Sequence, residues 1–258
     1  MNAAAARSRF RHLARAAILA VGLALPIAAC SAPGPRDGLA AADKVEPFNR
    51  RMLDGNKRMD TYLVRPVSRA YGAATPDLVK LLLTNGLSHL SLTGDLANHI
   101  LQANVDGTLK TLGRLTLNTV MGAGVLDPAT EMGLPRSQTD FGLTLASYGV
   151  PEGTYLVLPL IGPTTARDAA GFAVDRMFRP TTYLGMVSGA DGLAPGLTAV
   201  NIVNQRDQNF DLIDEVLYGS EDSYITLRSV YLQRRRSQVA GEGSTETLPD
   251  IFDDEEDN

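Results

Sequence analysis

The sequence has few of the side chains on which most catalytic and metal sites depend. Its 258 residues include one cysteine, three histidines and no tryptophan. A single cysteine excludes an internal disulfide framework. His12 belongs to the N-terminal segment, and His89 and His99, ten residues apart, match no zinc spacing. A G-x-S-x-G motif is also absent. We therefore expect no catalytic residues, no metal site and no cofactor.

Each end of the chain carries charge of one sign only. Four arginines lie within the first 15 residues and no acid precedes Asp37, whereas eight acids and no Lys or Arg follow Ser237. The body between them is nearly neutral, which argues against a nucleic-acid partner and against a polybasic membrane-binding surface. An acidic segment with few apolar residues cannot offset the entropy of ordering. We expect residues 239–258 to form a disordered acidic tail.

The 14 apolar residues of Ala16–Ala29 lie between the basic segment and the lone Cys30. A basic start, an apolar run and a small-residue exit are typical of a secretory signal, and this run is shorter than the roughly 20 residues of a spanning helix. The sequence Ile27-Ala28-Ala29 before Cys30 resembles the bacterial lipobox. We predict a lipoprotein signal peptide over residues 1–29, lipidation of Cys30 and a flexible tether over residues 30–43. Ser31, rather than Asp, after the cysteine favours the outer membrane in such lipoproteins.

Residues 44–238 predict one mostly helical domain. We expect helices that start at Pro76 with a Thr75 cap, at Asp95, after an Asp106 cap, after a Thr164 or Thr165 cap, at Pro195 and within Ser220–Ser223. The run Thr154–Pro163 is expected to be extended. Several of these helices are short and strongly apolar, so they could form a soluble core or lie within one leaflet. Composition alone favours the soluble core.

Four stretches, taken together, resemble the VacJ/MlaA family of outer-membrane lipoproteins. They run in order from Glu46–Tyr71 (EPFNRRMLDGNKRMDTYLVRPVSRAY) through Thr111–Pro135 (TLGRLTLNTVMGAGVLDPATEMGLP) and Asp140–Asp175 (DFGLTLASYGVPEGTYLVLPLIGPTTARDAAGFAVD) to Asp222–Arg235 (DSYITLRSVYLQRR). The sequence departs from the family pattern in two places. LDGNKRM stands where an aromatic-rich stretch is usual, and Ser223 stands where proline is common.

The resemblance implies a fold and a non-enzymatic function. The fold would be mostly all-α, a ring-like bundle of short helices embedded in the membrane leaflet, with Gly/Pro-rich loops. The protein would be lipid-anchored on the periplasmic side of the bacterial outer membrane. It would remove mislocalised phospholipid from the outer leaflet and pass it to a periplasmic lipid-binding protein, in association with a trimeric porin. A structural lipoprotein that braces porins or the envelope is the alternative. A lipid-modifying enzyme is disfavoured because no nucleophile arrangement is present.

Two groups of residues are candidates for the functional site. The loop from Met121 to Gly142 combines glycines with charged residues and could form a channel or gate, or an ordinary surface connection; its candidates are Gly122, Gly124, Asp127, Glu131, Gly133, Arg136 and Asp140. Near the C-terminus, Tyr224, Arg228 and Tyr231 share one helix face. This face could contact a partner, but docking of the last helix on the ring is the favoured interpretation.

Overall fold

The computed structural model describes residues 45–181 and 192–241. The chain divides into two units, Met1–Gly38 and Leu39–Asn258, and the structure below is that of the second unit. The predicted signal peptide, Cys30, the tether and all but the first residues of the predicted acidic tail lie outside the described residues.

The described residues are mostly helical, as the sequence predicts. The elements are, in chain order, α2 (Glu46–Met59), η1 (Asp60–Val64), α3 (Arg65–Ala74), α4 (Asp77–Leu101), α5 (Val105–Val120), α6 (Pro128–Glu131), α7 (Phe141–Ser147), β1 (Tyr155–Leu158), β2 (Gly162–Thr165), α8 (Ala166–Asp175), η2 (Arg176–Phe178), α10 (Leu193–Gln208), α11 (Phe210–Asp214), η3 (Glu215–Gly219) and α12 (Ser223–Ala240). The turns η1 and η3 are π-helical, so α2 runs into α3 and α11 runs into η3 without a loop.

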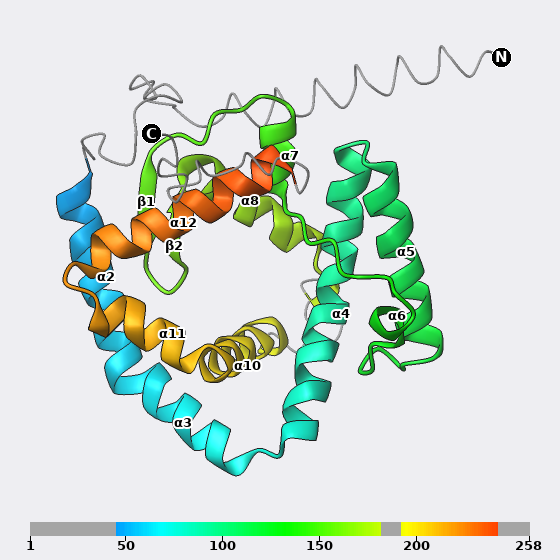
Figure 1. Ribbon diagram of the computed structural model, residues 1–258, viewed down its shortest axis with the longest axis horizontal. Helices are drawn as coiled ribbons and strands as arrows, with labels where there is room; N and C mark the ends of the chain where they lie inside the picture. The colour runs from blue at the N-terminus through cyan, green and yellow to red at the C-terminus, as the bar shows by residue number, and fades with distance from the viewer. Residues whose placement is uncertain (1–44, 182–191, 242–258) are drawn as a thin grey trace, which may run out of the picture. The chain divides into compact units, whose positions relative to one another are not determined.

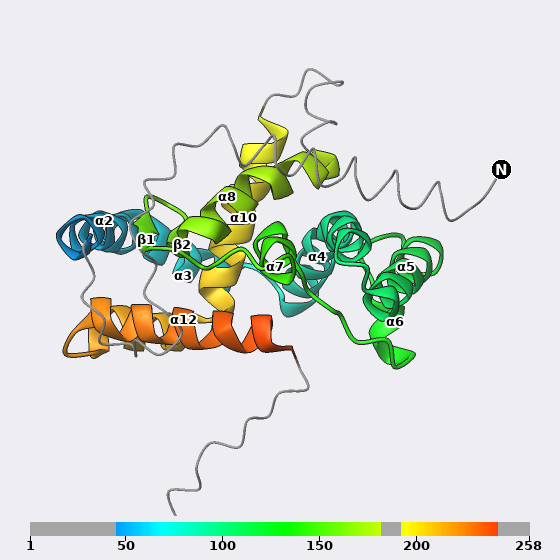
Figure 2. The same cartoon turned by 90° about the horizontal axis from the view of Figure 1, so that it is seen from above.

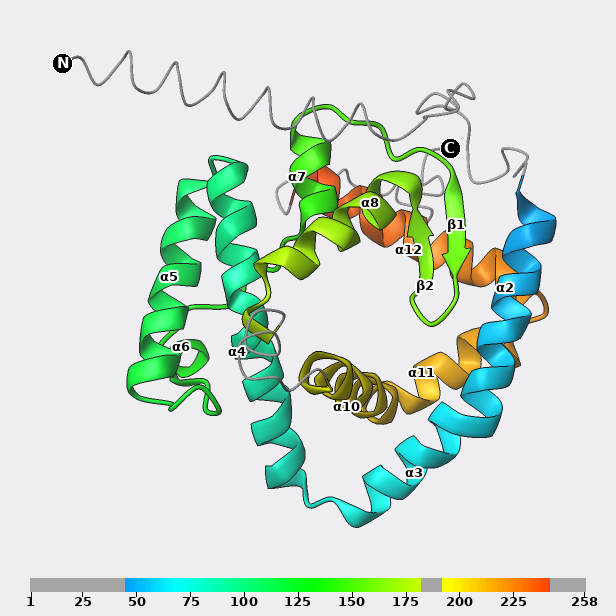
Figure 3. The same ribbon diagram turned by 180° about the vertical axis from the view of Figure 1, so that it is seen from behind.

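The helices of this unit are arranged as a ring (Figures 1 and 3). The continuous helix of α2, η1 and α3 forms one side, and α4 forms the next. Helices α7 and α8 and the β-hairpin close the ring, since α7 contacts α4 and β1 contacts α2. Helix α10 lies on the inner side of α3 and α4, whereas α5 packs on the outer side of α4. Figure 2 shows α12 and the end of α8 on opposite faces of the ring.

Helix α4 corrects two of the sequence predictions. It is a single helix of 25 residues, so the expected separate helix at Asp95 does not exist. Gly94 does not interrupt it, because a glycine inside a helix costs only about 0.5–1 kcal/mol. The predicted Thr75 cap is also wrong: Thr75 ends α3, and the extended backbone of Pro76 precedes α4.

Side-chain caps set the start of three further helices. Asn104, not Asp106, caps α5 and accepts a hydrogen bond from the Gly107 backbone nitrogen at 2.9 Å. Thr165, one of the two threonines predicted as the cap, caps α8. Asp222 caps α12, which therefore starts at Ser223, within the predicted segment.

The run predicted to be extended forms a two-stranded antiparallel hairpin. Tyr155 pairs with Thr165, and Leu158 pairs with Gly162. Asn49 of α2 holds β1 in place, because its amide donates to the Tyr155 carbonyl at 3.0 Å and accepts from the Val157 nitrogen at 2.9 Å. An apolar cluster then joins α2, β1 and α12; its buried members are Leu53, Tyr155, Val157, Tyr224 and Leu232.

The buried residues of the described part of the chain are mainly polar. Seventeen polar or charged residues are buried there, against seven hydrophobic ones, while 28 large hydrophobic side chains are exposed. Soluble domains instead bury mainly hydrophobic residues, and their charged residues are almost never fully buried unless they are paired. The core is therefore held by hydrogen bonds and ion pairs, such as the buried pair of Arg206 with Asp60 at 2.9 Å.

Helices α7 and α8 pack so closely that only glycine fits between them. A Cβ atom on Gly171 would lie 2.5 Å from the backbone nitrogen of Gly142. We expect Gly171→Ala to lower the free energy of unfolding by about 1–3 kcal/mol through overpacking. Gly55→Ala in α2 is the matched control, because no atom lies within 4 Å of its added Cβ. The control should gain about 0.5–1 kcal/mol from helix propensity. Equal denaturation midpoints for the two variants would refute this packing account.

Candidate functional site: a polar cavity inside the helical ring

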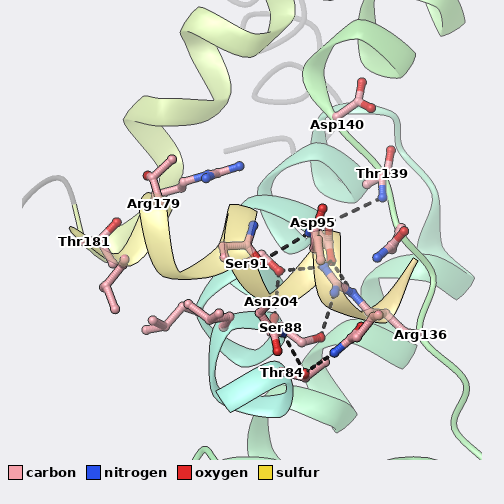
Figure 4. A pocket seen from close by; sticks show the side chains of 18 of the residues that line it. Thr84, Ser88, Ser91, Asp95, Arg136, Thr139, Asp140, Arg179, Thr181 and Asn204 are labelled. Atoms are coloured by element: carbon pink, nitrogen blue, oxygen red, sulfur yellow. Dashed lines mark hydrogen bonds and ion pairs between the residues drawn. The ribbon is translucent and has the colours of Figure 1, made fainter. Parts of the chain in front are cut away.

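A cavity of about 620 Å³ lies among α4, α7, α10, α12 and the segments that precede α7 and follow η2. Figure 4 shows part of its lining, with side chains from four of these regions directed toward a common space. Its lining residues are Thr84, Leu87, Ser88, Leu90, Ser91, Asp95, Arg136, Gln138, Thr139, Asp140, Leu143, Arg179, Thr181, Ala194, Leu197, Thr198, Asn201, Asn204, Gln205, Gln208, Tyr231, Arg234, Arg235 and Gln238. Hydroxyl, amide and charged groups outnumber apolar side chains in this wall, so the cavity can accommodate a polar ligand.

One wall is built around Arg136. Its guanidinium donates to Asp95 Oδ2 at 2.8 and 3.1 Å, to Ser88 Oγ at 2.7 Å and to Ser91 Oγ at 2.6 Å. The three acceptors share one face of α4, because they lie at i, i+3 and i+7. Burial raises the pKa of Asp95, although the charge and hydrogen bonds of Arg136 oppose the shift. The pair fixes the segment before α7 against α4.

A second network joins α12 to α7 and α8 through Arg235. The buried Arg235 guanidinium donates to both Asp140 oxygens at 2.7 Å and to Asp168 at 2.7 and 2.9 Å. Tyr231 donates its hydroxyl proton to Asp168 Oδ2 at 2.8 Å. Burial would raise the pKa of Asp168, but the hydrogen bonds and charge of Arg235 outweigh it and lower the pKa. Asp168 is therefore ionised in this network.

Helix α10 supplies the amide side of the cavity. Asn204 is buried, donates to Thr84 Oγ1 at 2.9 Å and accepts a hydrogen bond from the Tyr71 hydroxyl at 3.0 Å. Gln208 also donates to Thr84, at 2.6 Å. Two further amide side chains, Asn201 and Gln205, line the cavity from the same helix. These groups offer both donors and acceptors to a ligand.

The loop predicted to form a channel or gate only partly lines this cavity. Of its seven candidates, Arg136 and Asp140 are lining residues. The other five, Gly122, Gly124, Asp127, Glu131 and Gly133, lie outside the lining. The Gly124 and Gly133 φ angles of +76° and +80° are conformations that favour glycine. Gating by the loop stays a prediction.

Asp127 holds the loop to α5. It accepts hydrogen bonds from Arg114 Nη2 at 2.7 Å and from Asn118 Nδ2 at 2.9 Å, and it caps α6. Burial opposes its ionisation, but the hydrogen bonds from Thr130, Arg114 and Asn118 outweigh burial and lower its pKa to about 2. Its principal contacts are thus structural.

The low pKa of Asp127 predicts acid sensitivity. An unfolded aspartate has a pKa of about 3.9, so the folded chain holds this proton less tightly than the unfolded chain. The resulting stabilisation, about 2 kcal/mol, is complete above about pH 5 and is lost progressively as the pH falls toward 2. These pKa values set a range of about pH 6 to pH 2 for the test. Over that range, the free energy of unfolding should decline less steeply for Asp127→Asn than for the parent protein. Identical slopes would contradict the assignment.

The predicted docking face on α12 contacts other elements of the same unit. Tyr224 is 1% exposed and meets the Tyr155 ring edge-on, with centroids 6.0 Å apart. The Arg228 guanidinium lies 6.0 Å from the same Tyr155 centroid, and Tyr231 bonds to Asp168. That this face serves to dock the last helix on the ring, rather than to contact a partner, stays a prediction.

The sequence interpretation missed most of the cavity wall. The missed polar residues form stripes at helical spacing on two helices: Thr84, Ser88, Ser91 and Asp95 on α4, and Asn201, Asn204, Gln205 and Gln208 on α10. A polar stripe along a largely apolar helix was the signal available in the sequence.

The family comparison matches most of the chain. The family model described as MlaA lipoprotein covers residues 41–238. The chain belongs to the MlaA lipoprotein family. The intermembrane phospholipid transport system lipoprotein MlaA of Escherichia coli (strain K12) is 31% identical over 225 residues, which are 85% of this chain and 86% of that protein. An uncharacterized protein of Rickettsia felis is 34% identical over 203 residues, 78% of this chain and 79% of its own length.

A solved structure also resembles this chain. It is described as the structural basis for maintenance of bacterial outer membrane lipid asymmetry. The two structures superpose with a TM-score of 0.67, and their sequences are 30% identical. The match covers 77% of this chain and 99% of the other chain. The match confirms the mostly helical fold and the VacJ/MlaA resemblance. Within residues 45–181 and 192–241, no helix is long and apolar enough to cross a membrane. The same residues contain no cluster of three or more potential metal ligands.

Proposed function

We propose that this MlaA-family chain removes mislocalised phospholipid from the outer leaflet of the outer membrane and passes it to a periplasmic carrier. The observation that carries the proposal is the polar cavity inside a ring whose exposed surface is rich in large hydrophobic side chains. A phospholipid has one charged end and two apolar chains. A polar interior within an apolar exterior accommodates both parts.

The energetics of lipid movement support this arrangement. Taking a charged headgroup into hydrocarbon is costly unless polar groups replace its water. The hydroxyl, amide and guanidinium groups of the cavity can do so. On the outside, Val105, Leu109, Leu112 and Val120 of α5 are exposed, by 70%, 63%, 47% and 78%. Such side chains suit the acyl region of a leaflet, so we propose that the ring is embedded there rather than spanning the bilayer.

We propose that lipid on Cys30 anchors the chain on the periplasmic side. An acyl chain contributes about 0.8 kcal/mol for each buried CH₂ group. We expect Cys30→Ala to lose metabolic palmitate label and its membrane-dependent function. Label that persists on the alanine variant would overturn the anchor. The family resemblance supports two partners, a trimeric porin and a periplasmic lipid-binding protein.

A deletion strain separates lipid transport from envelope bracing. Surface-exposed phosphatidylethanolamine can be labelled with an amine-reactive reagent that does not cross the outer membrane. Under the proposal, labelling rises in the deletion strain and returns to the parental level when the chain is expressed. If envelope strength fell in the deletion strain while labelling stayed unchanged, the bracing lipoprotein would be the better account.

A further inference from the structure

The four arginines that line the cavity fall into two classes. Arg136 and Arg235 are bound to aspartates, as described above. Arg179 and Arg234 are exposed, and within the described residues no ion pair or side-chain hydrogen bond engages either guanidinium. The charge of Arg179 reaches Asp175 only as a longer-range effect on its pKa. The cavity wall therefore holds two cations that are free to meet a ligand.

The two acids of the wall show the opposite situation. Asp95 is bound by Arg136, and Asp140 is bound by Arg235. Among residues 45–181 and 192–241, no other carboxylate lines the cavity. In the described lining, a ligand thus meets unpaired positive charge, whereas both carboxylates are paired.

The unpaired arginines also lie on different elements. Arg179 follows η2, at the end of α8, and Figure 4 shows its side chain extending from that segment toward the interior. Arg234 belongs to α12, which Figure 2 places on the opposite face of the ring from the end of α8. The two free guanidinium groups thus reach the cavity from different elements of the ring.

We propose that Arg179 and Arg234 form two phosphate-binding positions that make the cavity selective for anionic phospholipids, such as phosphatidylglycerol, over phosphatidylethanolamine. This inference rests on the proposed transport function and names its substrate class. A guanidinium matches phosphate oxygens in a two-pronged, charge-assisted geometry. Phosphatidylethanolamine carries an additional ammonium group, which these cations repel and for which the described lining offers no unpaired carboxylate. It is therefore bound less well than phosphatidylglycerol but is still carried, so its surface labelling still reports transport. Phosphatidylglycerol carries only hydroxyl groups there, and the Gln and Asn side chains of α10 can bind them.

The test measures which lipid the full-length, lipidated protein takes up. Detergent-solubilised protein is incubated with vesicles of equal phosphatidylglycerol and phosphatidylethanolamine content, reisolated, and its bound lipids are quantified by mass spectrometry. We expect phosphatidylglycerol to be enriched about tenfold over the vesicle ratio. The double variant R179Q/R234Q should return to the vesicle ratio. The control R51Q/R58Q removes the same charge from exposed positions of α2 outside the cavity and should keep the enrichment.

The outcomes separate this inference from the proposed function. Lipid bound at the vesicle ratio by the parent protein would overturn the selectivity and leave transport standing. A parent protein that binds no lipid would overturn the transport proposal itself. Inorganic phosphate provides the second arm: if it displaced phosphatidylglycerol at equal concentration, the arginines would serve a soluble phosphate, and the lipid assignment would fall. If the control R51Q/R58Q lost the enrichment as fully as R179Q/R234Q, the assignment of Arg179 and Arg234 as the phosphate-binding positions would also be refuted.

Discussion

Replacing Arg235 with methionine lowers the free energy of unfolding by about 3–5 kcal/mol, the loss expected when one partner of a buried ion pair is removed. Arg235 and Asp168 are each less than a tenth exposed. Without the guanidinium, Asp140 loses its ion pair, and the buried Asp168 keeps only Arg167 at 3.2 Å and the Tyr231 hydroxyl as partners. Helix α12 then loses its ion pairs to these two aspartates. Guanidinium chloride titration of the detergent-solubilised protein, followed by circular dichroism, measures the change.

The adjacent arginine is the matched control for this prediction. Arg236 pairs with Glu152 at 2.7 Å, but both side chains are substantially exposed. Its replacement by methionine should change stability by less than about 1 kcal/mol. The double variant R235M/D168N should recover part of the loss, because part of the cost lies in the buried charge of Asp168, which Arg167 alone then balances. Equal losses for R235M and R236M would contradict the role of the buried network.

Filling the cavity should abolish lipid removal without unfolding the chain. Gln205 lines the cavity from α10, is exposed, and donates one hydrogen bond, to Asn201 at 3.3 Å. Gln205→Trp places a bulky indole in the lipid route at little cost to packing. We expect surface phosphatidylethanolamine labelling at the level of the deletion strain, with a normal amount of the variant in the outer-membrane fraction.

Ile202 provides the control from the same helix. Its side chain is 38% exposed and does not line the cavity. Ile202→Trp should therefore retain lipid removal, which shows that a tryptophan on α10 is not harmful in itself. Normal labelling with Gln205→Trp, at normal protein level, would mean that lipid does not pass through this space.

The sequence predicts the local elements of this fold well because their signals are local. The Thr154–Pro163 run becomes the hairpin, and Thr165 caps α8. The failures are local as well. Pro76 ends one helix and precedes the next, so Thr75 terminates α3 instead of capping α4. Gly94 looks like a helix break before Asp95, but ring contacts of α4 override its weak propensity.

The cavity could not be assembled from the sequence because its contacts are long-range. Arg235 lies 67 residues from Asp168 and 95 residues from Asp140. No helical or strand period relates such positions, so only the folded ring brings them together. Arg136 and Asp140 were identified through their place in a charged loop, whereas the polar stripes of α4 and α10 were overlooked among apolar neighbours. Two polar stripes that face one cavity indicate a polar interior. Only the tertiary structure, however, shows that the two stripes face the same space.

Photo-crosslinking with a headgroup-labelled phospholipid tests the central claim most directly. The purified, lipidated protein is incubated with a phospholipid that carries a photoreactive group on its headgroup, irradiated, digested and mapped by mass spectrometry. Passage through the cavity predicts crosslinks to the lining residues of α4 and α10, such as Ser91 and Asn201, and their loss in Gln205→Trp. Crosslinks confined to the outer surface, such as the exposed side chains of α5, would contradict it.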